Sequence, residues 1–182
     1  MLYTALLGES ALNTSNTAYR LHLQDGSGKL IPSKTLDSTS IITLDELITT
    51  SGFVPNFIKI DTDGFDFKIL RGAKNTLLKH KPVLFFEWDR QHLEAQGENP
   101  LSIFPFLETI GYHMLLIFDN FGTLLCKLSS KDTNNLTLLI EYTIHSKQHI
   151  YYYDVLALHK ESLFCPEAYL ATRTTKPPNY TG

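Results

Sequence analysis

The chain has 182 residues, of which 43% are hydrophobic and 19% are charged. This length and this balance predict one folded domain and exclude a disordered chain. The formal net charge of -3 leaves no basic surface for phosphate backbones, so nucleic acid is excluded as a main partner.

The apolar segments are too short for a membrane protein. The longest runs are "VLFF" and "MLLIF", whereas a helix needs about 20 apolar residues to cross a bilayer. The N-terminal stretch "MLYTALLGES" has no basic region of the kind that opens a signal peptide. We therefore expect a cytoplasmic protein without a membrane partner, in which Cys126 and Cys165 are either free thiols or one disulfide.

Strands and turns are predicted first along the chain. Residues 19–23 alternate apolar and polar side chains, which is typical of a strand, and "QDGSGK" (24–29) predicts a turn. The string "GSGK" lacks the spacing of a phosphate-binding loop, and Pro32 follows where a helix would have to extend. We interpret it as a turn only.

A capped helix and a strand come next. Thr43 and Glu46 have the spacing of a capping box before an apolar stripe, and Gly52 ends the helix. After Pro55, the segment "NFIKID" (56–61) predicts a strand.

The following segment predicts one long helix. Asp63 is placed to cap the first free N–H groups, and Asp66 favours the positive end of the helix dipole. An apolar residue recurs at every fourth position from 65 to 77, which marks a buried helix face. The helix ends at "LKHKP", where Pro82 forbids continuation.

Strands and helices alternate over the rest of the chain. "PVLFFEW" (82–88) is apolar on both faces, as expected for a strand in the middle of a parallel sheet. A helix then begins after Pro100 or near Ser102 and ends at Gly111, and it is followed by a strand (112–119), a helix (135–146) and a buried strand (150–159). We predict an α/β domain over residues 1–165 with helices on both faces of its sheet, and a disordered tail over residues 166–182.

Charged residues gather where two of these strands end. Asp61 and Glu87 lie at the carboxyl ends of successive strands, which is the edge where α/β folds bind ligands. A lone buried charge is costly, so we expect Lys59 to pair with one of these two carboxylates. The position favours a functional polar cluster, and the alternative is a structural ion pair that fixes strand register.

We do not predict a metal site here. Asp61, Asp63 and Asp66 offer oxygen ligands, but their spacing does not match a calcium loop and two of them are assigned to capping. His92, in the loop after the second strand, is a candidate base, and Trp88 and Asp89 are candidate pocket residues, with a core position as the alternative for Trp88.

Residues 57–87 resemble a known family. The stretch "FIKIDTDGFDFKILRGAKNTLLKHKPVLFFE" is similar to the signature region of FkbM-type methyltransferases, where a strand "KIDVEG" leads into a helix "E-x-x-VLRGA" and a strand ending in "FE". "TLDELI" and "YYYDVLALH" also resemble that family, so the resemblance spans residues 43 to 160. Asp63 and Asp66 stand where the family usually has Glu, which preserves the charge.

The resemblance implies a Rossmann-like fold that binds S-adenosylmethionine. It implies methyl transfer to a hydroxyl oxygen of a sugar, polyketide or related metabolite, so the acceptor is expected to be a small molecule or a glycan. Lys59, Asp61 and Asp63 would border the cofactor. The base that takes the acceptor's proton would be Asp61, Glu87 or His92.

One part of the family pattern has no counterpart in this sequence. Family members begin with a strand that ends in a glycine-rich "D-x-G-A-N-x-G" turn and a second strand that ends in an acidic residue, and nothing of that kind precedes residue 43. We therefore expect an N-terminally truncated sheet without its first two strands, whose open edge is covered by a second copy or a complementing chain.

Three explanations fit this departure: a truncated gene, a fragment completed by another polypeptide, or a domain that has lost catalysis. A non-catalytic scaffold subunit is therefore the alternative to an enzyme.

Overall fold

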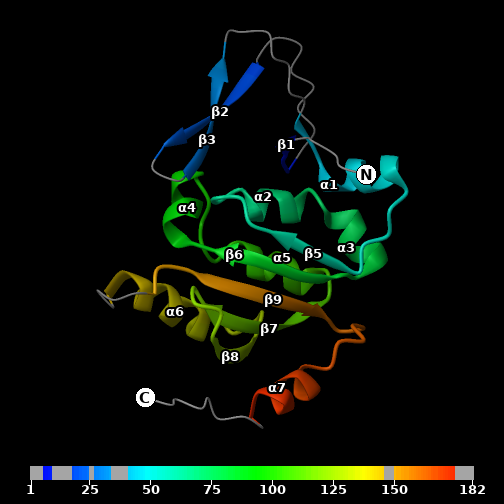
Figure 1. Cartoon of the computed structure of the whole chain (residues 1–182), viewed down its shortest axis with the longest axis vertical. Coiled ribbons are helices and arrows are strands. Elements are labelled where there is room, and N and C mark those ends of the chain that lie inside the picture. The colour runs from blue at the N-terminus through cyan, green and yellow to red at the C-terminus, as the bar shows by residue number, and fades with distance from the viewer. Residues whose placement is uncertain (1–5, 10–17, 25–26, 34–40, 146–149, 175–182) are drawn as a thin grey trace, which may run out of the picture.

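Five strands form the main sheet of the computed structural model, which describes residues 6–9, 18–24, 27–33, 41–145 and 150–174. In spatial order they are β5 (Phe57–Ile60), β6 (Val83–Trp88), β9 (Tyr153–His159), β7 (Tyr112–Asp119) and β8 (Leu124–Ser129) (Figure 1). β5 and β6 are parallel, and the other three pairs are antiparallel. The sheet is therefore mixed, and the prediction that β6 lies inside a parallel sheet is wrong.

The other elements are seven helices and four further strands in the described residues. The helices are α1 (Leu44–Ser51), α2 (Asp66–Arg71), α3 (Lys74–His80), α4 (Arg90–Ala95), α5 (Ile103–Thr109), α6 (Thr133–His145) and α7 (Pro166–Thr174). β1 (Leu6–Leu7) pairs with β4 (Ile41–Ile42), and β2 (Ala18–Gln24) pairs with β3 (Ser27–Ser33). The strand predicted at 19–23 is confirmed, residues 27–29 of the predicted turn belong to β3, and residues 25–26 lie outside the described residues.

The core lies between one face of the main sheet and helices α2 and α5. Trp88 of β6 packs edge-on against Phe104 of α5 with ring centroids 4.8 Å apart, and Phe86 meets Phe67 of α2 at 6.2 Å. All four side chains are buried, and the indole Nε1 of Trp88 donates to the carbonyl of Pro100 at 2.7 Å. Trp88 is therefore a core residue.

Helix α7 lies over the opposite face of the sheet. Tyr169 meets Phe118 of β7 with ring centroids 6.5 Å apart, and Glu167 pairs with Lys127 of β8 at 2.7 Å. An apolar cavity of ≈ 350 Å³ remains between this helix and the sheet, so the cover is incomplete. Because residues 166–174 are helical, the prediction of a disordered tail is wrong for them, and residues 175–182 lie outside the described part.

The predicted long helix is broken into α2 and α3 at Gly72. A Cβ at this position would overlap the carbonyl of Gly8, so another segment passes directly against the break. The carboxylate of Asp45 in α1 then accepts from the amides of Asn75 at 2.9 Å and Thr76 at 2.7 Å, which caps the start of α3. The buried apolar face is confirmed, but tertiary contacts divide the helix.

Capping was predicted correctly for α1 and incorrectly for α2. Thr43 Oγ1 accepts from the amide of Glu46 at 3.1 Å, the Glu46 carboxylate accepts from the amide of Thr43 at 2.8 Å, and Gly52 ends α1 at φ 67°. Asp63 does not cap α2, because this helix begins at Asp66 and its N-cap residue is Phe65, which makes no capping hydrogen bond through its side chain. Helix α4, at a segment predicted to be a loop, and strand β8 were both missed.

Candidate functional site

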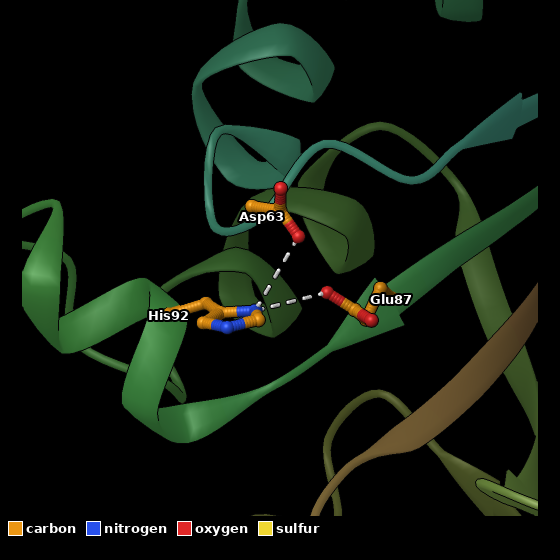
Figure 2. Close-up of side chains that lie close together, drawn as sticks. All are labelled: Asp63, Glu87 and His92. Carbon is orange, nitrogen blue, oxygen red and sulfur yellow. Dashed lines mark hydrogen bonds and ion pairs between the residues drawn. The ribbon is translucent and has the colours of Figure 1, made fainter. Parts of the chain in front are cut away.

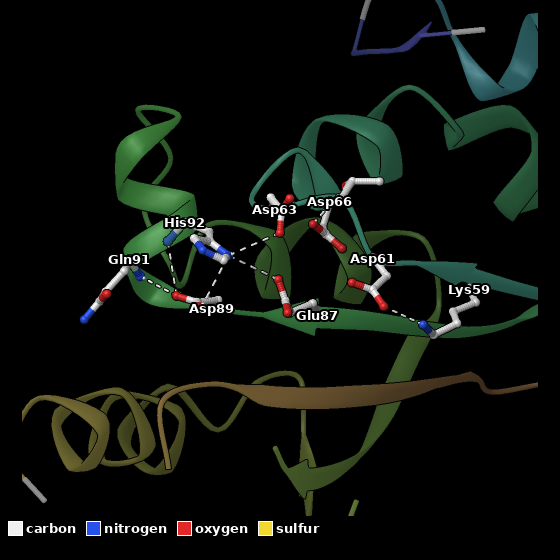
Figure 3. A network of polar contacts seen from close by, with 9 residues as sticks. Lys59, Asp61, Asp63, Asp66, Glu87, Asp89, Gln91 and His92 are labelled. Atoms are coloured by element: carbon white, nitrogen blue, oxygen red, sulfur yellow. Dashed lines mark hydrogen bonds and ion pairs between the residues drawn. The ribbon is translucent and has the colours of Figure 1, made fainter. Parts of the chain in front are cut away.

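Four polar side chains meet at the carboxyl ends of β5 and β6, and we call Asp63, Glu87, Asp89 and His92 the strand-end cluster (Figure 3). His92 Nδ1 lies 3.5 Å from Glu87 Oε2, 3.6 Å from Asp89 Oδ2 and 3.8 Å from Asp63 Oδ1. Figure 2 shows Asp63 and Glu87 pointing at the imidazole from two different elements. The structure therefore brings together three of the residues predicted for the site, Asp63, Glu87 and His92.

Local backbone structure holds these side chains in place. Asp89 caps α4, because its Oδ1 accepts from the amides of Gln91 at 2.7 Å and His92 at 3.1 Å. Asp63 has a left-handed backbone with φ 49°, and Gly64 follows at φ 94°. A Cβ at Gly64 would overlap the carbonyl of His92, so the loop after β5 packs directly against α4.

Negative charge is crowded around Glu87. Its side chain is 12% exposed, and burial, followed by the charge of Asp66, raises the pKa of Glu87 to about 7 despite the hydrogen bond to His92. Asp66 is itself buried, and burial raises its pKa although Thr62 Oγ1 donates to its carboxylate at 3.0 Å. The site therefore disfavours full ionisation of its carboxyl groups.

Lys59 and Asp61 form a separate exposed pair beside the cluster. Lys59 Nζ lies 2.5 Å from Asp61 Oδ2, which confirms the predicted pairing. Their side chains are 53% and 57% exposed, so the argument from the cost of a buried charge does not apply, and such a pair adds little stability. Both remain accessible to a ligand at this edge.

Sequence reasoning missed Asp154, which lies directly opposite Glu87 in the antiparallel pair of β9 and β6. Burial and the charge of Asp61 raise the pKa of Asp154, so it adds to the same field. The sequence did contain a signal for Asp154, since it is an acidic residue inside the largely apolar strand "YDVLALH". Its relation to Glu87 depends on a strand register that spans more than sixty residues of chain.

The mixed sheet, the helices that cover it and the polar site at the carboxyl ends of its strands are consistent with the class of Rossmann-like methyltransferases. The family model described as "Methyltransferase FkbM domain" matches residues 5–114, which is more than half of the chain and contains the whole strand-end cluster. The chain belongs to the FkbM methyltransferase family, as the resemblance indicated. No curated protein and no solved structure matches it. Among the described residues, none of the helices has the length and apolar character needed to cross a membrane.

Proposed function

We propose that this chain is an S-adenosylmethionine-dependent O-methyltransferase acting on a hydroxyl group of a sugar, polyketide or similar small molecule or glycan. The observation that carries the proposal is the contact between His92 and Glu87 at 3.5 Å, at the carboxyl ends of two parallel strands in a member of a methyltransferase family. Two proton acceptors at a ligand-binding edge suit a reaction that must deprotonate a hydroxyl group.

The charges at this edge fit the cofactor. S-adenosylmethionine has a positive sulfonium, a positive ammonium and a negative carboxylate. The exposed carboxylate of Asp61 and the half-exposed carboxylate of Asp63 would attract the cationic groups, and the exposed Lys59 would attract the carboxylate. These are the residues that we expect to hold the cofactor.

The residues of the chain would position the acceptor and take its proton. Bound S-adenosylmethionine supplies an electrophilic methyl group, whose bond to sulfur breaks with its electron pair going to the sulfur. As the acceptor oxygen forms its bond to the methyl carbon, its proton passes to Glu87, His92 or Asp61. Alignment contributes most to such a displacement, and the base adds a factor of about 10² to 10⁴.

Calorimetric titration of the purified chain with S-adenosylmethionine tests the proposal. We expect binding of one molecule per chain, weakened by Asp61→Asn and unchanged by Asp132→Asn, a matched change at the start of α6. In the presence of an acceptor, we expect Glu87→Gln to slow formation of S-adenosylhomocysteine about 10²-fold or more without weakening cofactor binding. A folded sample that does not bind the cofactor would contradict the proposal.

A non-catalytic scaffold subunit is the second candidate, and the edge of the sheet favours it. Among the described residues β5 pairs only with β6, and Phe57 on this edge strand is 53% exposed. A second copy or a complementing chain would cover this edge. Size-exclusion chromatography separates the candidates, since a monomer that binds S-adenosylmethionine supports the enzyme and a stable complex without cofactor binding supports the scaffold.

A further inference from the structure

The strand-end cluster has the spacing of a metal-binding site. Asp63, Glu87 and His92 each offer one ligand atom, and these atoms all lie within 4.8 Å of one another (Figure 2). The two distances from His92 Nδ1 are 3.5 and 3.8 Å. Ligand atoms arranged tetrahedrally about 2.1 Å from one ion lie about 3.4 Å apart. One ion would therefore fit between the three side chains after small movements.

The surroundings lack positive charge. Asp63, Asp66, Glu87 and Asp89 place four carboxyl groups around this point, and in the described part of the chain none of these carboxylates forms an ion pair with a lysine or arginine. The nearest cations along the chain are engaged elsewhere: Arg90 pairs with Glu94, Lys68 donates to the carbonyl of Gln96, and Lys59 pairs with Asp61. Carboxylates that are withdrawn from water need a counter-charge, and a divalent ion supplies two.

Asp66 provides a second and independent indication. The residue is 1% exposed, and its Oδ1 has no hydrogen-bond partner in the described structure. Figure 3 shows its carboxyl group beside Asp63 and turned toward Glu87, whose titration it affects. Burial raises the pKa of Asp66 and hydrogen bonds from Thr62 and from the backbone of Gly64 and Glu87 lower it, yet its Oδ1 has no donor in good hydrogen-bond geometry. A water bound to an ion inside the cluster would supply that donor.

The ligand-bearing segments are fixed against each other. The close approach of Gly64 to the backbone of His92 locks the Asp63 loop onto α4, and the Asp89 cap sets the first turn of that helix. Glu87 comes from the rigid strand β6. A site built in this way needs little rearrangement to accept an ion.

We propose that Asp63, Glu87 and His92 bind one divalent metal ion, and that buried Asp66 accepts a hydrogen bond from a water on that ion. The imidazole nitrogen favours a first-row transition metal such as Mn²⁺ or Zn²⁺ over Mg²⁺ or Ca²⁺. Of the three direct ligands, only Asp63 is among the three aspartates for which the sequence analysis considered and rejected a metal site.

The role of the ion rests on the proposed function, whereas its binding does not. In methyl transfer, a metal at this edge would bind the acceptor hydroxyl and lower its pKa, and with Glu87 and His92 as its ligands Asp61 would be the group that takes the proton. The affinity for the ion alone is measurable whether or not the chain transfers methyl groups.

Titration of the metal-free full chain with Mn²⁺, followed by the EPR signal of the free ion, tests the inference. We expect one ion per chain, with binding weakened at least about tenfold by Asp63→Asn and by His92→Asn. Glu94→Gln removes a charge on the same helix, from a residue that pairs with Arg90, and should leave the affinity unchanged. Circular dichroism of each variant confirms that it is folded.

A pulsed EPR measurement of nitrogen coupling to bound Mn²⁺ adds a direct readout of His92. The coupling should be present in the native chain and absent in His92→Asn. The inference would be overturned if the chain failed to bind one Mn²⁺, or if Glu94→Gln and Asp63→Asn lowered the affinity for Mn²⁺ equally. The cluster would then be a histidine that contacts carboxylates and binds no metal. S-adenosylmethionine titrated into the metal-free sample keeps the two questions apart, since cofactor binding without Mn²⁺ binding refutes only the metal site.

Discussion

Gly64→Ala should destabilise the protein more than an equivalent change at Gly97. Both glycines have left-handed backbones, with φ 94° and 74°. A Cβ at Gly64 would overlap the carbonyl of His92, whereas nothing lies within 4 Å of a Cβ at Gly97. The two positions therefore share the backbone cost and differ in packing.

The left-handed conformation costs an alanine about 1–2 kcal/mol, so we expect Gly97→Ala to lower the free energy of unfolding by that amount. At Gly64 the overlap involves a helix backbone, and displacing it adds about 1–3 kcal/mol. Gly64→Ala should therefore cost about 2–5 kcal/mol, a large part of the 5–15 kcal/mol typical of a domain.

Urea unfolding measures both changes through the fluorescence of Trp88, the one tryptophan of the chain, which is fully buried. Equal losses in the two variants would show that the loop after β5 does not contact α4. In that case the rigid placement of Asp63 against His92 would also be wrong.

Three further changes test other parts of the fold. Asp45→Ala removes the acceptor of two amides at the start of α3 and should lower stability by about 1–2 kcal/mol, whereas an unchanged urea midpoint would refute the cap. Hydrogen bonds, led by that from His113, outweigh burial and hold the pKa of Glu108 at about 2, so its contribution is present above pH 4.5 and is lost as the pH falls toward 2. Glu108→Gln should flatten the fall in stability over this pH range, and a parallel curve for variant and native chain would refute the reasoning. Tyr112→Phe leaves the buried carbonyl of Pro82 without its 2.8 Å donor and should cost about 1–2 kcal/mol, while a neutral effect would mean that water replaces the hydroxyl.

Local signals in the sequence predicted the elements that local interactions determine. The capping box of α1 involves residues three positions apart, and its geometry follows directly from the sequence. Four of the five strands of the main sheet, β5, β6, β7 and β9, were recognised from their apolar runs, and the family resemblance added the class of fold.

Tertiary contacts decide the features that the sequence did not reveal. The break between α2 and α3 depends on the passage of Gly8 at Gly72 and on a cap from Asp45 in another helix. The mixed character of the sheet depends on β9 inserting between β6 and β7, and an apolar run on both faces suits either strand direction.

The position of His92 could nevertheless have been predicted from its spacing of three residues from Asp89. Asp89 is a good N-cap residue immediately after β6, and the N3 position of the helix it starts is His92, whose backbone the cap binds. A helix that begins there turns its N3 side chain back toward the strand end, where Glu87 lies. The segment was interpreted as a loop because it has little apolar periodicity, and α4 buries only Leu93. The cap of a short helix thus positions the histidine of the site, which couples the local folding of α4 to the chemistry that we propose for the cluster.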